Sequence, residues 1–323
     1  SYEFKELFES CGIENPLKIR ELNPLYAVHF ENRNKPFLIY KDLQKLAKEF
    51  DGIESSLAEK TEKYLDEAGR LFHDTENIVV NKNFSSKLDY LLQLTKVPVK
   101  HGPKMFRSMW SELEKNFDSQ EVKVIFSLVS FFLGSTPFQT PAVYSLLNYT
   151  ELKHDGYWNV EGGMYKIVTE IKKILDQRGV KFHFNTNITA IEESNGKLTA
   201  AIAEDGRKFT GDHIVCNGDA ASFRGQVLNR PKFTPEKLDK LEWTLAPFTI
   251  YLGVKGKLEN LHHRNYFLGN NFKDLYYQKT KLMSFIVIFS QTCQNQKLSI
   301  RHSLTTLYQV TTAFFGKILM EFD

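Results

Sequence analysis

The stretch Gly134-Ser-Thr-Pro-Phe-Gln-Thr-Pro-Ala-Val-Tyr-Ser-Leu-Leu147 is the most informative part of the sequence. Pro137 and Pro141 predict that one helix ends near Leu133 and that another begins after them, because proline lacks an N–H and fits only the first turn of a helix. The second helix would carry apolar side chains on one side: Val143, Tyr144 and Leu147. On physical grounds alone, the stretch is a joint between two helices in a core.

The segment after this joint has the pattern of an α/β unit. Trp158-Asn-Val-Glu-Gly-Gly-Met164 leads into a helix with apolar residues at helical spacing up to Leu175, and Gly179 is placed to end it. Alternating or apolar runs then predict strands, with turns at Ser194–Lys197 and Glu204–Gly206 between them. The predicted strands are Val180–Phe184, Ile188–Ile191, Leu198–Ile202, the one at Phe209, and the buried run His213–Cys216.

The first half of the chain reads mainly as helix. Residues 22–40 predict a β-hairpin, since Tyr26, Val28 and Phe30 alternate with other residues and a polar turn follows. Residues 41–75 have helical spacing, and residues 84–132 are mostly helical in pattern.

Composition excludes several classes of protein. The 323 residues carry 42 basic and 39 acidic side chains, and this near balance gives no support to nucleic-acid binding. Three cysteines without a C-x-x-C pair argue against a disulfide scaffold or a zinc site and fit the cytoplasm. The longest apolar run, Val124–Leu133, is far shorter than the roughly 20 residues that span a bilayer.

Several signature motifs are absent from the sequence. It has no G-x-G-x-x-G turn for a dinucleotide pyrophosphate, no P-loop, no H-E-x-x-H and no G-x-S-x-G. The histidines show no metal-ligand spacing, so we expect no metal site.

The motifs together resemble the FAD-dependent carotenoid (phytoene-type) desaturase family. Its pattern G-x-S-P-F-x-x-P-x-x-Y-S-L matches Gly134–Leu147 apart from Thr136, and Trp158–Met164 matches aromatic-x-P-x-G-G-M with Val160 at the proline. The stretches Asn185–Ile191, His213–Asp219 and Phe248–Gly253 are similar to further family segments, in the same order. The resemblance covers roughly residues 1–270 and indicates the middle of such an enzyme.

The resemblance implies an α/β fold, with α+β character in the substrate part: an FAD-domain remnant and a substrate-binding, helical domain. We expect residues 1–150 to be substrate-binding and helical, 151–220 to belong to the FAD-binding domain, 221–270 to return to the substrate domain, and 271–323 to be an atypical tail. The cofactor would be FAD, contacted by a few backbone and polar positions: Gly162, Gly163, Ile188, Asn217 and Asp219.

The N-terminal βαβ unit and the C-terminal flavin segment of the family have no counterpart in this sequence. We therefore expect a fragment, split gene or frameshifted chain that holds no stable FAD alone. We also expect it to be poorly soluble or a homo-oligomer unless that N-terminal portion is supplied.

A polyene substrate has no polar handle, so its site should be an apolar tunnel lined by aromatic residues. The candidates are Phe126, Phe131, Phe132, Phe138 and Tyr144, for each of which an ordinary core position is the alternative. Family members carry an acid and an arginine where this chain has Glu121 and Lys123, which makes these two the catalytic candidates. A solvated helix face is the alternative for both.

Residues 91–110 mix apolar side chains with lysine and arginine, a composition that suits a membrane interface. We expect Phe106, Met109 and Trp110 to enter the lipid, and the protein to be cytoplasmic and peripheral on the membrane. An amphipathic core segment is the alternative.

The predicted function is thus desaturation of an apolar carotenoid, in which the family transfers a hydride from an allylic C–H to the flavin and loses a proton. Two other classes remain open: a flavin amine-oxidase relative acting on a polar amine, and a non-enzymatic remnant that binds lipid or membrane.

Overall fold

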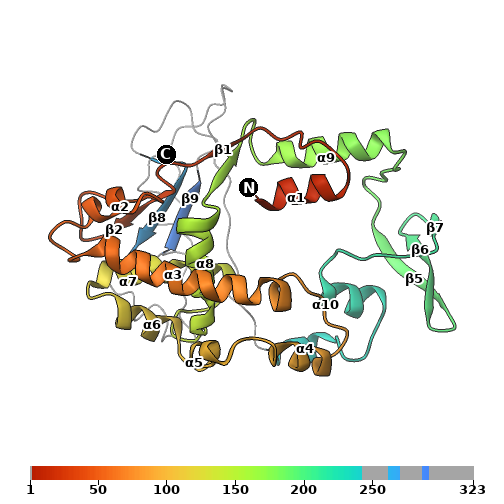
Figure 1. Ribbon diagram of the computed structural model, residues 1–323. Coiled ribbons are helices and arrows are strands. Elements are labelled where there is room, and N and C mark those ends of the chain that lie inside the picture. Colours follow the sequence, from red (N-terminus) through yellow and green to blue (C-terminus); the bar gives the residue numbers. More distant parts are fainter. Residues whose placement is uncertain (1, 242–260, 270–285, 291–323) are drawn as a thin grey trace, which may run out of the picture. The chain divides into compact units, whose positions relative to one another are not determined.

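In the first part of the chain, β2 (Tyr26–Phe30) and β3 (Phe37–Ile39) form an antiparallel hairpin, with Tyr26 opposite Ile39. The hairpin predicted over residues 22–40 is therefore confirmed. The computed structural model describes residues 2–241, 261–269 and 286–290 (Figure 1). The chain forms two compact units, one of residues 1–170 with 245–323 and one of residues 171–244.

In the first unit the hairpin belongs to a mixed sheet. β8 (Arg264–Leu268) runs parallel to β2, and β9 (Ile286–Ser290) pairs antiparallel with β8, which gives the order β3-β2-β8-β9. A separate antiparallel pair joins β1 (Ile19–Glu21) to β4 (Trp158–Val160). The parallel pairing places Tyr26 and Tyr266, which lie far apart in sequence, on adjacent strands.

Helices supply the rest of the first unit, and the helical segments predicted over 41–75 and 84–132 are confirmed. Their bounds are α1 (Tyr2–Ser10), α2 (Leu43–Glu49), α3 (Leu57–Thr75), η1 (Glu76–Val80), α4 (Lys87–Leu94), η2 (Val99–His101), α5 (Gly102–Phe106), α6 (Met109–Asn116), α7 (Gln120–Ser127), η3 (Leu128–Leu133), η4 (Ala142–Ser145), α8 (Leu146–Tyr149) and η5 (Thr150–His154). The joint predicted at Pro137 and Pro141 is also confirmed, because η3 ends at Leu133 and η4 begins at Ala142.

The core of this unit lies between the sheet and the helices. In α3, buried residues recur every three or four positions, so one face of the helix is covered along its whole length. The fully buried large side chains of the unit are Leu25, Ile39, Leu46, Phe50, Leu57, Tyr64, Leu65, Leu71, Met109, Leu113, Phe117 and Phe126.

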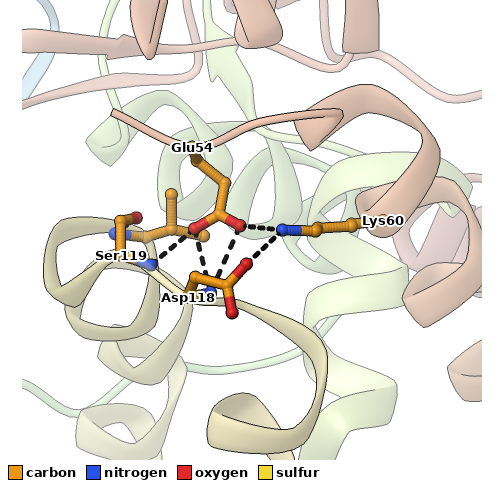
Figure 2. A network of polar contacts seen from close by, with 5 residues as sticks. Glu54, Lys60, Asp118 and Ser119 are labelled. Carbon is orange, nitrogen blue, oxygen red and sulfur yellow. Dashed lines mark hydrogen bonds and ion pairs between the residues drawn. The ribbon is translucent and has the colours of Figure 1, made fainter. Parts of the chain in front are cut away.

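A buried carboxylate ties the start of α3 to the start of α7 (Figure 2). Glu54 accepts hydrogen bonds from the backbone N–H of Asp118 (3.0 Å) and of Ser119 (2.6 Å), and it also accepts one from the ammonium of Lys60. Lys60 reaches Asp118 as well, at 2.6 Å. The negative charge therefore meets the positive end of the α7 backbone, where helix N–H groups lack partners.

The second unit contains the end of α9 (Tyr165–Gln177) and a three-stranded antiparallel meander of β5 (Ile188–Ser194), β6 (Lys197–Ala203) and β7 (Lys208–Thr210). Asn195 and Gly196 both have positive φ, as a two-residue hairpin turn between β5 and β6 requires. Gly179 ends α9 at φ 78° as predicted. Short helical turns follow: α10 (Ala220–Ser222), η6 (Phe223–Val227) and α11 (Pro235–Leu238).

Two predicted strands of the second unit are wrong. Val180–Phe184 and His213–Cys216 have no strand structure, and Phe184 and Val215 are 69% and 89% exposed. A strand exists through hydrogen bonds to a neighbouring strand, and among the described residues no strand pairs with either segment. Alternating apolar residues are therefore not sufficient to make these segments strands. Both are irregular, and most of their apolar side chains are exposed.

The helices and sheets agree with the predicted mixed α/β class. The family-like segment Phe248–Gly253 and most of the predicted tail 271–323 lie outside the described residues.

Candidate functional site

Residues of the Gly134–Leu147 stretch accept hydrogen bonds from the first turn of α6. The carbonyl oxygens of Pro137 and Thr140 accept hydrogen bonds from the N–H groups of Trp110 (3.0 Å) and Met109 (2.7 Å). These are first-turn N–H groups, which no residue of the helix itself can pair. The Trp110 ring also packs on Phe138, with 4.9 Å between ring centroids. The motif thus fixes α6 against the core.

The five aromatic tunnel candidates differ in their surroundings. Phe126 is buried in the core between Tyr64 and Phe117, and Phe131 and Phe138 pack at the edge of the same core. Phe132 and Tyr144 are 55% and 37% exposed. The structure therefore brings three of the five to one core and leaves two at its surface.

The two catalytic candidates lie on α7, and each is half-buried. Glu121 forms an ion pair with Arg33 at 3.3 Å, and Lys123 is half-buried one turn before Phe126. The Arg33 guanidinium also lies over the Phe37 ring at 4.5 Å. Glu121 therefore has a cationic neighbour supplied by the β2–β3 turn instead of by its own helix.

The flavin candidates Gly162 and Gly163 form a sharp turn just before α9. Their φ angles are 91° and 88°, a region that favours glycine, so the double glycine has a backbone reason. The N–H of Gly163 is already bonded to the carbonyl of Val160 at 3.0 Å, and the carbonyl of Gly163 accepts from Lys166. This turn therefore offers one fewer donor to a pyrophosphate than a free glycine loop would.

The other flavin candidates lie in the second unit. Ile188 is half-buried at the start of β5, and Asn217 is exposed. Asp219 is exposed and caps the short α10 by accepting the N–H of Ser222 at 2.7 Å, and hydrogen bonds from the backbone and hydroxyl of Ser222 lower its pKa. A half-buried isoleucine, an exposed asparagine and a carboxylate engaged in a cap do not by themselves form a binding site for FAD. We therefore assign no reaction step to a flavin on these residues.

A cluster of polar residues is buried in the first unit, and sequence patterns gave no role to it. Glu151 lies on η5 and is 6% exposed, close enough to Tyr26 of β2 and to Tyr157, just before β4, for their hydroxyl groups to influence its protonation. The Tyr26 ring stands edge-on to Tyr157 and to Tyr266 of β8, at centroid distances of 6.1 and 5.2 Å. The Arg264 guanidinium lies over the Tyr157 ring at 4.5 Å.

Burial controls the protonation of this cluster. It raises the pKa of Glu151 to about 7, although the hydrogen bond from Tyr26, the charge of Arg264 and the hydrogen bond from Tyr157 act in the opposite direction. Burial likewise raises the pKa of Tyr266 to about 12 and that of Tyr26 well above its usual value. At neutral pH the tyrosines are therefore hydrogen-bond donors, and Glu151 is the group that titrates.

No cluster of metal-ligating side chains occurs in the described part of the chain, and none of its helices is long and apolar enough to span a bilayer.

Comparison with known proteins decides the family. The model of the flavin containing amine oxidoreductases matches residues 1–278. The chain belongs to this family. Its sequence is similar to the zeta-carotene-forming phytoene desaturase of Myxococcus xanthus, with 25% identity over 272 residues, 84% of this chain and 52% of that protein. It is 25% identical to the phytoene desaturase of Phycomyces blakesleeanus over 322 residues, 97% of this chain and 53% of that protein.

A 4,4'-diapophytoene desaturase of Methylomonas is 24% identical over 284 residues, which are 85% of this chain and 54% of that protein. The chain thus spans about half the length of the curated relatives that it matches. The predicted resemblance to the carotenoid desaturases is confirmed, as is the predicted class of flavin-dependent oxidoreductase.

No sequence signal indicated the buried cluster around Glu151. Glu151 follows the Gly134–Leu147 stretch after three residues, and its neighbours Thr150, Lys153 and His154 are polar. Tyr26 and Arg264 could not be joined to it, because only the parallel pairing of β2 with β8 brings them together.

Proposed function

We propose that this chain provides the polyene-binding part of a carotenoid desaturase that uses FAD. The observation that carries the proposal is the match of residues 1–278 to the flavin family together with desaturase names among its relatives. The apolar core beside the Gly134–Leu147 stretch supports it, since a substrate without polar groups is recognised by apolar and aromatic surface. Phe131, Phe138 and Tyr144 are the residues proposed to contact it.

We propose further that the chain retains no flavin unless a dinucleotide-binding unit of the relatives' type is joined to it. The sequence has no G-x-G-x-x-G, and the five flavin candidates make no holder by themselves. The uncovered side chains of Val180, Phe182 and Phe184 are 44%, 37% and 69% exposed, and they offer an apolar strip on which such a unit could pack. In its absence, the exposed strip would favour a homo-oligomer or poor solubility.

The flavin proposal has a direct test. The chain is purified alone and after co-expression with the dinucleotide-binding segment of the Myxococcus relative, and bound FAD is measured by absorbance after gel filtration. We expect stoichiometric flavin only in the co-expressed sample. Stoichiometric flavin on the chain alone would overturn the proposal.

We also propose that the protein lies on a membrane surface through α4 and α5. In α4, Leu88, Leu91 and Leu92 recur at helical spacing and are 67%, 57% and 56% exposed. Val99 and Phe106 are 90% and 94% exposed close by in sequence. We call these five residues, from Leu88 to Phe106, the apolar patch. So many uncovered large apolar side chains favour contact with lipid.

Two residues predicted for the membrane face do not lie on it. Met109 and Trp110 are 0% and 4% exposed and belong to the core, because the first turn of α6 is held by the Pro137–Thr140 carbonyls. The basic residues are also partly engaged: Lys104 and Arg107 both form ion pairs with the buried Glu112, at 2.9 and 2.8 Å. Lipid binding should therefore depend more on apolar contact than on charge.

Liposome flotation tests the membrane proposal. Each half-exposed leucine contributes about 1 kcal/mol when it enters lipid, so replacing Leu88, Leu91 and Leu92 by serine should weaken the partition roughly a hundredfold. The matched control replaces three exposed apolar residues elsewhere: Leu7, Val168 and Val215, which are 45%, 52% and 89% exposed. Equal flotation of the two triple variants would contradict the proposal.

A second candidate function is a non-enzymatic lipid-binding protein, which the apolar patch favours. Flavin reduction by a polyene in the co-expressed protein separates the two, because only the desaturase transfers electrons to FAD. A polar amine as the better reductant would instead indicate an amine oxidase.

A further inference from the structure

The segment that leads from α4 to α6 begins with two basic side chains that turn toward α3. The Lys100 ammonium lies 2.7 Å from a carboxylate oxygen of Asp74 on α3, and Nε2 of His101 lies 2.8 Å from the same oxygen. His101 is buried in this contact, whereas Lys100 remains exposed. One carboxylate of α3 therefore holds both residues of η2.

The next two basic side chains of the segment are also paired with acids. Nζ of Lys104 lies 2.9 Å from Glu112 of α6 and 3.6 Å from Glu67 of α3. Nη1 of Arg107 lies 2.8 Å from the other carboxylate oxygen of Glu112, which is 1% exposed. A buried carboxylate needs such partners, because an unpaired charge away from water is costly. The basic groups from Lys100 to Arg107 are thus neutralised inside the protein.

The apolar side chains of the same segment are the ones left uncovered. Val99 and Phe106, near its two ends, are almost fully exposed, and Met105 is about half exposed. Surface segments usually show the opposite arrangement, with charged groups in water and large apolar side chains covered. We call residues 99–107 the neutralised segment.

We propose that the neutralised segment inserts Val99 and Phe106 into the hydrocarbon of a lipid surface and makes no use of headgroup charge, because Asp74 and Glu112 neutralise its cations. This inference rests on the proposed membrane binding and specifies the lipid that this part of the surface recognises. Charge supports lipid hydrocarbon as the occupant. An acidic partner would be bound by lysine and arginine, and here these side chains already have acidic partners within the chain.

Backbone contacts hold the end of the segment in place. The Arg107 carbonyl accepts the N–H of Ala142 at 2.8 Å, and Ser108 forms a β-bridge with Pro141. Phe106 directly precedes these contacts, so its exposed ring stands on backbone that is fixed before lipid is met. A fixed side chain loses less conformational entropy on binding than a mobile one does.

Vesicle flotation of the whole chain tests the proposal, with phosphatidylcholine vesicles and with vesicles that also contain phosphatidylglycerol. Asp74→Asn leaves Lys100 and His101 without their carboxylate, so Lys100 can reach the headgroups. The ratio of anionic to neutral partition should rise about fivefold over wild type, the effect of one lysine near an anionic surface. Comparison with wild type cancels the contribution of the lysines on and beside α4: Lys82, Lys87 and Lys96.

Asp66→Asn is the matched control, since it removes a carboxylate from the same helix, where Asp66 pairs with Lys153 at 2.6 Å. Asp66 lies about 12 Å from Asp74 along the helix, which exceeds the Debye length of about 8 Å at physiological salt. The ratio should therefore stay at the wild-type value. Both aspartates are partly exposed, at 32% and 48%, and circular dichroism should show that both variants fold.

A double variant tests the apolar contact. Val99→Ser with Phe106→Ser should weaken binding to both kinds of vesicle about a hundredfold and leave the ratio unchanged. If wild type floats but Asp74→Asn has the wild-type ratio, or Asp66→Asn raises the ratio equally, neutralisation is overturned and membrane binding stands. If wild type floats with neither vesicle, both proposals fail. A dimer in gel filtration that the double variant dissociates, with flotation unchanged, would identify a second copy of the chain as the occupant and overturn the inference.

Discussion

Replacing Glu54 by glutamine should destabilise the first unit, because this change removes a buried charge that three donors share. The Glu54 side chain is 0% exposed and accepts from Lys60 and from the backbone N–H groups of Asp118 and Ser119 (Figure 2). Donors surround both carboxylate oxygens, so the amide NH₂ of glutamine would face at least one donor. The variant therefore loses a charge and gains an unfavourable contact.

The size of the effect follows from burial. Removing one partner of a buried ion pair costs roughly 3–5 kcal/mol. Lys60 is 27% exposed and keeps Asp118 as a partner, so we expect about 2–3 kcal/mol for Glu54→Gln. This corresponds to a fall in Tm of about 4–10 °C. Asp118→Asn is the control: its side chain is 86% exposed, and the loss should stay below about 1 kcal/mol.

The pH dependence gives an independent check on the same residue. Burial alone would raise the pKa of Glu54, but the hydrogen bonds from Lys60, Ser119 and Asp118 outweigh it and lower the pKa below 4.5. The ionised carboxylate thus stabilises the fold above pH 4.5, and this contribution is lost as the pH falls through the lowered pKa. Thermal unfolding followed by circular dichroism should show a smaller loss of Tm in acid for Glu54→Gln than for wild type. Equal Tm values of wild type and Glu54→Gln at pH 7, or an equal loss in Asp118→Asn, would refute the role of this contact.

Two substitutions test the packing of α3. Gly69→Val should lower the free energy of unfolding in urea by about 1–3 kcal/mol, because a Cβ at Gly69 would lie 2.6 Å from the ring of Tyr149. The control Gly102→Ala should be near neutral, since the space around Gly102 is open. An unchanged urea midpoint for Gly69→Val would show that the Tyr149 ring moves aside without cost. Asn148→Ala should cost about 2 kcal/mol, because its amide bridges the Tyr64 hydroxyl (2.8 Å) and the Phe126 carbonyl (3.0 Å) in the core. A loss below 0.5 kcal/mol, roughly the effect of a surface substitution, would argue against that bridge.

Local patterns predicted the elements whose partners lie close in sequence. The β2–β3 hairpin and the β5–β6 hairpin followed from alternation and from turn residues such as Asn195-Gly196. The end of α9 followed from Gly179, and the joint at Pro137 and Pro141 followed from proline geometry.

Predictions that needed distant partners were wrong or were not made. Val180–Phe184 has the alternation of a strand, but the described residues supply no neighbour for it. Met109 and Trp110 have the composition of a lipid-facing turn, and the carbonyls of a segment 30 residues later turn them inward. The cluster at Glu151 depends on the parallel register of β2 and β8, which no local pattern encodes.

The same limit applies to the candidate site. The family motifs located the Gly134–Leu147 stretch and the double glycine, and both have a definite structural role. The five aromatic residues were chosen by type, and type does not distinguish Phe126, which is 1% exposed, from Phe132, which is 55% exposed. Burial depends on which face of a helix meets the core, and at a junction such as α7–η3 the helical period changes.

The proposed function is tested most directly by the redox reaction of the assembled protein. The chain co-expressed with a dinucleotide-binding unit is loaded with FAD, mixed without oxygen with phytoene in liposomes, and followed by the flavin absorbance. A polyene desaturase should show flavin bleaching that depends on phytoene, together with a product absorbing at longer wavelength, and no bleaching with a polar amine. Flavin that stays oxidised with phytoene, or that is reduced by the amine instead, would contradict the assignment of this chain as the polyene-binding part of a desaturase.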